Sequence, residues 1–377
     1  MHIKQILQEQ LHDGKSWEDI EKYLDETLGL KLQHDEKFVG LNYCQINSPK
    51  SNPAVMECRA LTLDKQTLLP VSRAYDRFFN WGEMPEFYED FDIANTVVME
   101  KCDGSLIRVW WNCYDDRWEI GTRSMYYGEG GHQTGISFRS LALEFVGMTE
   151  EEFQICFNQV AEKHKTYIFE MIGPRNRIVT RYKNEQWVLT GIRDNINGKY
   201  DTMFKMKSTV EAIKQFSNKV RIVETISLNS FEKIVEAAKN LSDLQEGFVA
   251  WCQKTNKRIK MKSPVYVSVH GIRENGQLSR KRALTLVLMN EQEEYLSYFE
   301  EDRPFFDPLV SEVEAFMKSI SDKWQEVKHI ENQKDFAMLV KDHPASGILF
   351  AAKKQQKDPL HVFAETDTNK KLRFFGF

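Results

Sequence analysis

The sequence predicts an α+β fold in which a strand-rich region is followed by a smaller, mostly helical C-terminal domain. Over residues 38–266, short runs of β-branched, aromatic and aliphatic residues alternate with turn residues, which is typical of antiparallel strands with interspersed helices. Ahead of this region, residues 1–35 place apolar side chains at helical spacing around a break at Gly14. Helical spacing returns from about Leu284 and continues to Trp324.

These changes of pattern predict two domains, since a chain of 377 residues is long for one compact core. We expect one domain over residues 1–270, with residues 1–35 as its helical N-terminal part, and a second domain over residues 271–377. Three short apolar runs near the C-terminus are compatible with strands as well as helices. They lie at residues 348–350, 361–363 and 372–375.

The composition indicates a globular protein without a membrane span. Hydrophobic residues make up 41% of the chain and charged residues 28%, which allows both a core and a solvated surface. No apolar run approaches the roughly 18 residues that a span requires, and the six cysteines form no CxxC pair. We therefore expect free thiols in a reducing cytoplasm, which is the host cytoplasm if the protein is viral. The net charge of −5 argues against nucleic-acid binding by bulk electrostatics, so any such site should be a local basic groove.

The most specific short motif is Glu100-Lys101-Cys102-Asp103-Gly104. Apolar strand-like runs precede and follow it, and Asp-Gly is a turn signal. We therefore expect Lys101 to end a strand and to direct its amine into a pocket. Taken alone, so short a motif more often marks a solvated lysine beside a hairpin turn.

Four other residues, which lie further along the chain, favour a functional role for this motif. Glu170 and Glu246 each adjoin an apolar strand-like run, and Lys260 and Lys262 stand two apart in another. Each alone is more simply explained as a surface residue. Together with Lys101 they form the ordered set of a covalent nucleotidyltransferase, which has a lysine nucleophile, two carboxylates and two lysines on one strand face.

The chemistry of nucleotidyl transfer requires these residue types. Attack on the α-phosphate of ATP needs a neutral amine, so Lys260, Lys262 and a bound Mg²⁺ are expected to lower the pKa of Lys101. Glu246 is our choice for the metal, because one or two carboxylates and substrate oxygens typically hold Mg²⁺ in phosphoryl transfer. Glu170 is either a second metal ligand or an acceptor for the ribose hydroxyl, and the sequence leaves both roles open.

Further motifs make the chain resemble the tRNA-repair RNA ligases of T-even-type bacteriophages, within the covalent nucleotidyltransferase superfamily. The resemblance covers about residues 57–270, and its additional motifs distinguish this branch from DNA ligases. These motifs are Glu57-Cys58-Arg59, Arg77-Phe78-Phe79-Asn80, Asn176-Arg177-Ile178-Val179 and Lys260-Met261-Lys262-Ser263.

The resemblance implies an antiparallel-sheet nucleotidyltransferase (ATP-grasp-like) domain and an ATP-dependent RNA ligase that uses Mg²⁺, with Mn²⁺ as a substitute. It implies that Lys101 receives AMP, that AMP passes to an RNA 5′-phosphate, and that a 3′-hydroxyl then displaces AMP. The implied substrate is RNA, in particular tRNA with a broken anticodon loop. An end-healing kinase-phosphatase is a candidate partner, and we expect a monomer.

Carried over to this sequence, the resemblance implies that Arg59 contacts phosphate beside the nucleotide. The chain departs from the family pattern at three positions. The glycine that usually follows this arginine is Ala60, and the lysines usual at two further positions are Arg77 and Arg123. Because arginine keeps the positive charge and adds a bidentate fork, we expect phosphate binding to survive at both positions.

Basic residues that follow Glu170 closely are candidates for an RNA-binding groove, and the aromatic Tyr182 and Trp187 are interleaved with them. These basic residues are Arg175, Arg177, Arg181 and Lys183. A solvated hairpin explains the same charges equally well.

Two other functions remain open from the sequence. One is a different covalent nucleotidyltransferase, such as a DNA ligase or a capping guanylyltransferase, although those usually carry a small β-barrel where residues 285–330 have helical spacing. The other is a catalytically silent RNA-binding relative, against which the intact Lys101 and Glu246 argue. A separate hypothesis concerns Cys102, because cationic surroundings would favour its thiolate unless the side chain points into the core.

Overall fold

The computed structural model describes the chain except for residues 132–134, 177–179, 242–244, 264–272, 275–276 and 297–298. Its contacts divide the chain into two compact units. The first unit comprises Met1–Gly14, Leu32–Asn42 and Asn52–Val267, and the second comprises Lys15–Lys31, Tyr43–Ser51 and Ser268–Phe377. The division after Val267 lies close to the boundary expected at residue 270, but Lys15–Lys31 and Tyr43–Ser51 group with the C-terminal residues.

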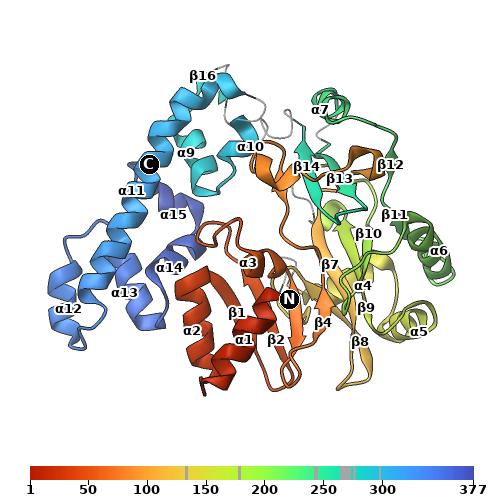
Figure 1. The fold of residues 1–377 in the computed structure, drawn as a ribbon, viewed down its shortest axis with the longest axis horizontal. Coiled ribbons are helices and arrows are strands. Elements are labelled where there is room, and N and C mark those ends of the chain that lie inside the picture. Colours follow the sequence, from red (N-terminus) through yellow and green to blue (C-terminus); the bar gives the residue numbers. More distant parts are fainter. Residues whose placement is uncertain (132–134, 177–179, 242–244, 264–272, 275–276, 297–298) are drawn as a thin grey trace. The chain divides into compact units, whose positions relative to one another are not determined.

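The N-terminal helices are α1 (His2–His12) and α2 (Trp17–Leu28) (Figure 1). They confirm the helix pair predicted around Gly14, but the end of the segment expected to be helical, residues 30–34, forms a strand instead. A capping box starts α2, because Ser16 accepts from the amide of Asp19 while the Asp19 carboxylate accepts from the amide of Ser16. The helix ends at Gly29, whose φ of +60° suits glycine.

A four-stranded sheet has the order β1-β2-β3-β4. Its pairs β2·β3 and β3·β4 are antiparallel. The short helix α3 (Pro53–Glu57) leads from β2 towards β3, and the Asn52 side chain caps its first amides. The strands are β1 (Leu30–His34), β2 (Phe38–Tyr43), β3 (Leu61–Asp64) and β4 (Pro70–Arg73).

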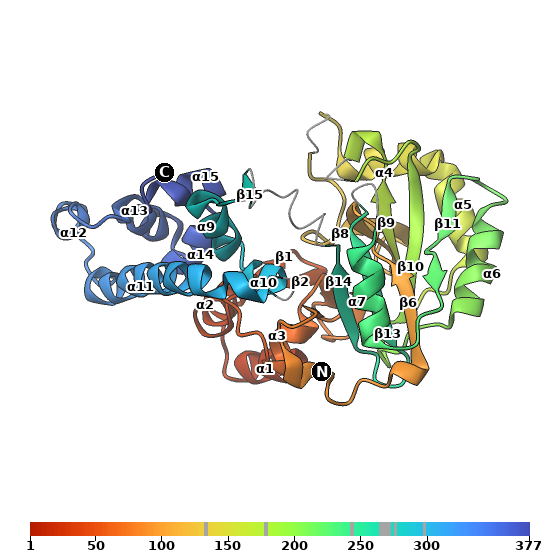
Figure 2. The ribbon, with the colours of Figure 1, turned by 90° about the horizontal axis from the view of Figure 1, so that it is seen from above.

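A five-stranded sheet of the first unit has the order β11-β10-β9-β7-β8. All its pairs are antiparallel except β10·β11. Helices α4, α5 and α6 pack on this sheet (Figure 2) and bury its apolar side chains. The strands are β7 (Ser105–Asn112), β8 (Arg117–Thr122), β9 (Lys165–Ile172), β10 (Gln186–Asp194) and β11 (Val220–Ile222), and the helices are α4 (Phe138–Val146), α5 (Glu150–Val160) and α6 (Met203–Ile213).

A second five-stranded sheet of the first unit has the order β12-β6-β13-β14-β5. Helix α7 (Phe231–Lys239) packs against β13 and β14 and closes a smaller core. The strands are β5 (Phe79–Asn80), β6 (Thr96–Glu100), β12 (Thr225–Ile226), β13 (Gly247–Cys252) and β14 (Arg258–Lys262). Short 3₁₀ helices are η1 (Pro85–Tyr88), η2 (Ile93–Asn95), η3 (Pro174–Asn176) and η4 (Glu300–Asp302). The predicted mixture of antiparallel strands and helices is thus confirmed.

The described part of the second unit is mostly helical beyond a two-stranded hairpin, β15 (Arg273–Glu274) and β16 (Gln277–Leu278). The apolar runs at residues 348–350 and 361–363 lie in helices, and the run at residues 372–375 begins in α15 and ends in a turn. Asp358 and Asp367 cap the first amides of α14 and α15, and Pro359 occupies the first turn of α14. None of the described helices is long and apolar enough to cross a bilayer. The helices are α9 (Arg280–Leu288), α10 (Gln292–Leu296), α11 (Arg303–Val327), α12 (Gln333–Val340), α13 (Ser346–Gln355), α14 (Pro359–Glu365) and α15 (Thr368–Arg373).

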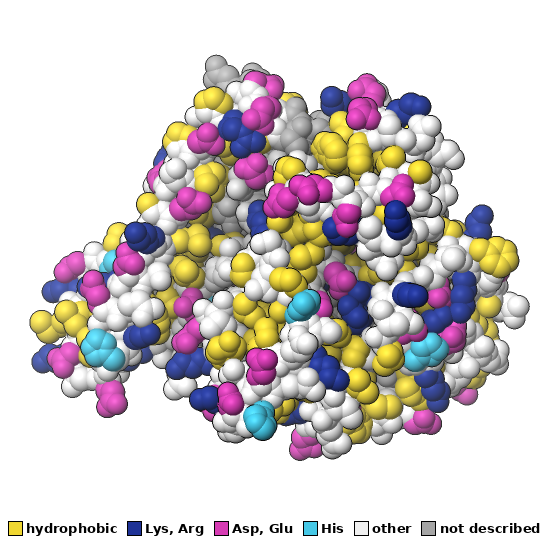
Figure 3. All heavy atoms as spheres, in the orientation of Figure 1, with side chains coloured by type: hydrophobic (Ala, Val, Ile, Leu, Met, Phe, Trp, Pro, Cys, Tyr) yellow, Lys and Arg dark blue, Asp and Glu magenta, His cyan; other side chains and the backbone are white. Residues whose placement is uncertain are grey.

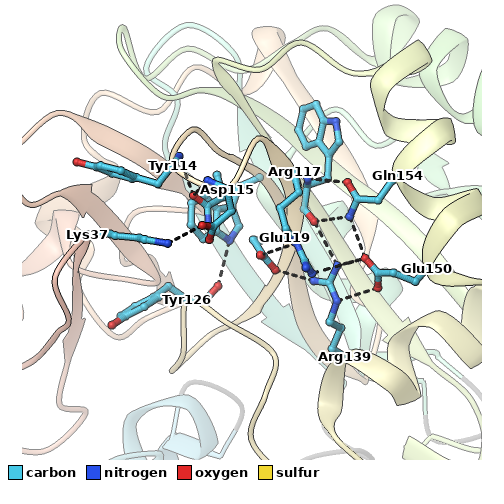
Figure 4. A network of polar contacts seen from close by, with 12 residues as sticks. Lys37, Tyr114, Asp115, Arg117, Glu119, Tyr126, Arg139, Glu150 and Gln154 are labelled. Atoms are coloured by element: carbon cyan, nitrogen blue, oxygen red, sulfur yellow. Dashed lines mark hydrogen bonds and ion pairs between the residues drawn. The ribbon is translucent and has the colours of Figure 1, made fainter.

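A partly buried polar network joins β8 to α4 and α5 (Figure 4). The Arg139 guanidinium donates to Glu119 at 2.7 Å and to both carboxylate oxygens of Glu150. Gln154 completes the network by exchanging hydrogen bonds with the backbone of Trp118 at 2.8 Å. Since each buried charge has an opposite charge in contact, the network fixes the two helices on the sheet edge.

Candidate active site

Lys101 and Glu246 meet where two strands of the second five-stranded sheet end. Lys101 directly follows β6, and its backbone amide donates to the carbonyl of Gly247 at 2.8 Å. Its ammonium forms an ion pair with Glu246, whose side chain is only 5% exposed. On the other side, the amide of Ser263 donates to the carbonyl of Glu246 at 2.7 Å. The sequence placed both residues at strand ends, and the structure brings them into contact.

Glycines at two motif positions allow strands to approach closely here. A Cβ on Gly104 would lie 2.3 Å from the carbonyl oxygen of Met171 on β9. A Cβ on Gly247 would lie 2.1 Å from the carbonyl oxygen of Met261 on β14, and the φ of Gly247 is +142°. Both positions therefore require glycine for steric reasons. Gly104 lies against β9, the strand that carries Glu170, and Gly247 directly follows Glu246.

Glu170 comes from the other five-stranded sheet, on β9, where it pairs with Leu106 of β7. Burial raises its pKa from 4.5 to about 7; Lys101 and Arg59 oppose this rise, and Glu246 adds to it. Glu170 therefore shares an electrostatic environment with the other predicted site residues. Near neutral pH it is divided between its protonated and charged forms.

The lysine pair on β14 lies beside the Lys101–Glu246 pair. Lys260 and Lys262 are half-buried, and Met261 between them is fully buried, as strand alternation predicts. Lys262 stands opposite Gly247 in the antiparallel pairing of β13 and β14. The two lysines therefore share the strand end that carries Glu246.

Arg59 lies over the ring of Phe78 at 4.8 Å, and the Lys260 ammonium lies 5.0 Å from the same ring. Ala60, the residue after Arg59, stands where the family usually has glycine. It adopts a φ of +53° and is fully buried. Asn42 accepts from the Ala60 amide at 2.9 Å, and Arg108 donates to the Ala60 carbonyl at 2.7 Å. These bonds hold alanine in a backbone conformation that glycine would adopt without strain.

The remaining predicted residues have varied surroundings. Arg77 is buried, 5.7 Å from the ring of Phe79, whereas Arg123 is exposed just after β8. Arg175 is exposed and its guanidinium is engaged by two glutamates, at 2.5 Å from Glu144 and 2.6 Å from Glu185. Arg177 lies outside the described residues. On the face seen in Figure 3, described acidic and basic side chains are interspersed without a large region of one sign.

Sequence reasoning missed two buried arginines near this site. Arg258 precedes Lys260 by two residues on β14, so strand alternation already placed it on the same face. Its guanidinium lies 3.9 Å from the ring of Tyr200 and 4.4 Å from that of Tyr75. Within the described part of the chain, Arg108 on β7 donates to neutral oxygens alone, and burial lowers its pKa to about 9. No local sequence pattern indicated the buried position of Arg108.

The thiolate hypothesis for Cys102 is wrong. Its side chain is 7% exposed, and burial raises the pKa of the thiol well above its usual range, so the neutral thiol is favoured.

Comparison with known proteins identifies the family. The family model described as RNA ligase matches residues 57–266, which is more than half of the chain, and the chain therefore belongs to the RNA ligase family. An Autographa californica nuclear polyhedrosis virus protein, provisionally named as a bifunctional polynucleotide kinase/RNA ligase, is 28% identical over 86% of this chain and 46% of its own length. The RNA ligase of Rhodothermus phage RM378 is 24% identical over 74% of this chain and 76% of its own length.

A mutant RNA ligase of Naegleria gruberi, solved with ATP and Mn, is 20% identical to this chain, with a TM-score of 0.41 over 54% of this chain and 59% of that one. The chain spans about half the length of the Autographa californica nuclear polyhedrosis virus relative and 63% of a Thermovibrio ammonificans relative. The resemblance seen in the sequence is confirmed at the level of the RNA ligase family.

Proposed function

We propose that this protein is an ATP-dependent RNA ligase that joins a 5′-phosphate to a 3′-hydroxyl through a lysyl-AMP and an adenylylated RNA. The observation that carries the proposal is the placement of Lys101, the proposed nucleophile, in contact with Glu246 at the end of a strand. Family membership supports the reaction class, and the half-buried Lys260 and Lys262 beside this pair support phosphate binding.

The proposed roles follow from charge and position. Lys101 supplies the amine that bonds to the α-phosphorus of ATP as the bond to pyrophosphate breaks, and it must first lose its proton. Lys260, Lys262 and Arg59 would neutralise phosphate charge, with Arg77 and Arg123 as further phosphate contacts. Positioning and charge neutralisation supply most of the catalysis in such phosphoryl transfers.

The carboxylates fit a magnesium ion. Among the described residues, no group of three or more His, Cys, Asp or Glu side chains gathers at one point. Mg²⁺ in phosphoryl-transfer sites usually takes one or two carboxylates together with substrate oxygens, and Glu246 with Glu170 offers that donor set. When bound, the ion would neutralise phosphate charge. Glu170 would otherwise accept from the ribose, and Mn²⁺ would substitute for Mg²⁺.

We further propose RNA with broken strands as the substrate, in particular tRNA cut in its anticodon loop, and a protein acting as a monomer in the cytoplasm. An end-healing kinase-phosphatase would prepare such ends. A relative whose name joins polynucleotide kinase to RNA ligase supports this pairing of activities. The mostly helical second unit is the proposed RNA-specificity domain, with Arg175 and Arg177 of the first unit as candidate RNA contacts.

Incubation with α-labelled ATP or, separately, α-labelled GTP, followed by denaturing electrophoresis, tests the proposal. We expect a protein-linked label from ATP alone. A label from GTP would indicate a capping guanylyltransferase, and the absence of label from a folded protein that binds ATP would indicate a catalytically silent relative. A second test compares sealing of nicked RNA and nicked DNA, where preference for DNA would contradict the proposal.

A further inference from the structure

We propose that the ion pair between Glu100 and Arg221 is a positioning device for the Lys101 nucleophile. The inference rests on the proposed function and adds two residues to it. Neither residue would touch the nucleotide, and each would act by holding the end of β6.

Glu100 is the last residue of β6, and both oxygens of its carboxylate have hydrogen-bond partners. One oxygen, Oε1, contacts Nη1 of Arg221 and accepts from the amide of Glu224 at 2.9 Å. The other oxygen, Oε2, lies 3.3 Å from Nη2 of Arg221. The side chains of Glu100 and Arg221 are 25% and 27% exposed, so solvent screens this pair less than it screens a surface pair.

The backbone around Lys101 is held from both sides. On one side, the amide of Lys101 donates to Gly247 of β13 at 2.8 Å. On the other side, the amide of Glu100 donates to the carbonyl of Glu224 at 2.9 Å. The Glu100 carboxylate strengthens this second side, because it accepts a hydrogen bond from the amide of the same Glu224. Loss of the pair would therefore leave this second side held by backbone contacts alone, through the Glu100–Glu224 bond and the pairing of β12 with β6.

The pair also joins the two sheets that supply the site. Arg221 belongs to β11, in the sheet that carries Glu170 on β9. Glu100 belongs to β6, in the sheet that carries Glu246 and the β14 lysines. The chain passes from one sheet to the other between β11 and β12, and β12 pairs with β6 at Met99. The ion pair thus lies beside the crossing and fixes the spacing between Lys101 and the Glu170 strand.

This placement predicts an effect on the chemical step. An in-line attack needs the amine within a narrow range of positions, and a displacement of about 1 Å costs on the order of 100-fold in rate. Binding of ATP depends on other side chains. Arg221→Met should therefore lower the maximal rate of lysyl-AMP formation by roughly 10-fold to 100-fold while leaving the KM for ATP unchanged.

Single-turnover labelling with α-labelled ATP over a range of concentrations measures both quantities. The variants are Arg221→Met, Arg221→Lys, Glu100→Gln and the double variant Glu100→Gln/Arg221→Met. Arg221→Lys retains the charge and should recover part of the rate. The double variant should be no slower than the worse single variant, since both remove the same contact. Arg117→Met is the matched control, because it removes an arginine paired with Glu119 at 2.9 Å on the far edge strand β8.

Sealing of pre-adenylylated RNA supplies a second readout, because that step does not use the Lys101 amine as a nucleophile. We expect Arg221→Met to seal such RNA at close to the parental rate. Labelling of Arg221→Met at the parental rate, an equal loss in both assays, or additive losses in the double variant would overturn the inference. If Arg221→Met does not fold, Arg221→Lys and Glu100→Gln decide by the same criteria. A parent protein that forms no lysyl-AMP would instead refute the proposed function.

Discussion

Charging Glu170 should destabilise the folded protein at neutral and alkaline pH, and Glu170→Gln should remove that penalty. Burial raises the pKa of this carboxyl from 4.5 to about 7, against the opposing effect of Lys101. The folded protein therefore binds the proton more tightly than the unfolded chain does. The stabilising contribution of this proton is fully present below pH 4.5 and is lost as pH rises through about 7.

The size of the effect follows from the two pKa values. At pH 8, charging Glu170 in the folded protein costs about 3 kcal/mol more than charging it in the unfolded chain, since one pKa unit corresponds to about 1.4 kcal/mol. At pH 5 the same difference is below about 1 kcal/mol. The free energy of unfolding of Glu170→Gln, relative to the parent, should therefore rise by about 2 kcal/mol between pH 5 and pH 8.

Urea unfolding of both proteins at intervals from pH 5 to pH 8 measures this difference. Glu185→Gln is the matched control. Its hydrogen bond to Arg175 lowers the pKa of Glu185, so that carboxylate stays charged across the range and its removal should give a constant difference. Parallel stability curves for Glu170→Gln and the parent would refute the assignment of a raised pKa to Glu170.

Three further predictions concern the site. Lys101→Ala should form no lysyl-AMP, and substantial labelling of the folded variant would remove Lys101 as the nucleophile. Lys260→Ala and Lys262→Ala should each slow adenylylation by about 100-fold, because each removes a charge from the proposed phosphate site, which is partly desolvated. Lys254→Ala, exposed in the same hairpin, is the control and should label normally. Gly247→Ala should lower stability by roughly 3 kcal/mol in thermal or urea unfolding, because its Cβ would meet the β14 backbone. Gly131→Ala, with open space around the added Cβ, should be nearly neutral, and equal effects of the two would contradict the steric argument.

Strand-end motifs were the part of the site that the sequence could predict. An apolar run followed by Lys101 or preceded by Glu246 defines a strand end, and alternation defines which β14 side chains share a face. The same rule would have identified Arg258. Contacts between distant segments were not predictable, because Glu100 and Arg221 are separated by 121 residues and no local pattern pairs them.

Local capping residues predict two of the three C-terminal helices that contain the apolar runs. The three C-terminal apolar runs are too short for periodicity to separate helix from strand, but the caps at Asp358 and Asp367 were visible signals for helices. The positive φ of Ala60 could not be read from an alanine, since its conformation is imposed by two hydrogen bonds, one donated to Asn42 and one accepted from Arg108.

The segments that make up the second unit affect how its proposed role in RNA specificity can be tested. Residues 15–31 group with residues 268–377, and Asp25 on α2 contacts His361 on α14. Lys31 also pairs with Glu365 at 2.5 Å. A chain that ends at residue 272 therefore keeps α2 but loses the elements it packs with.

We expect this shortened chain to be less soluble than the parent, because Ile20 and Leu24 of α2 are fully buried and each contributes about 1.5–3 kcal/mol through burial. Ile20→Glu and Leu24→Lys, introduced together in the shortened chain, should restore solubility. Because Lys101, Glu246 and the β14 lysines all lie in the first unit, the soluble protein should still form lysyl-AMP, while its preference among RNA ends should weaken. Sedimentation, labelling and competition between RNA ends measure these outcomes. A monodisperse shortened protein that binds ATP without forming lysyl-AMP would show that adenylylation depends on residues 273–377.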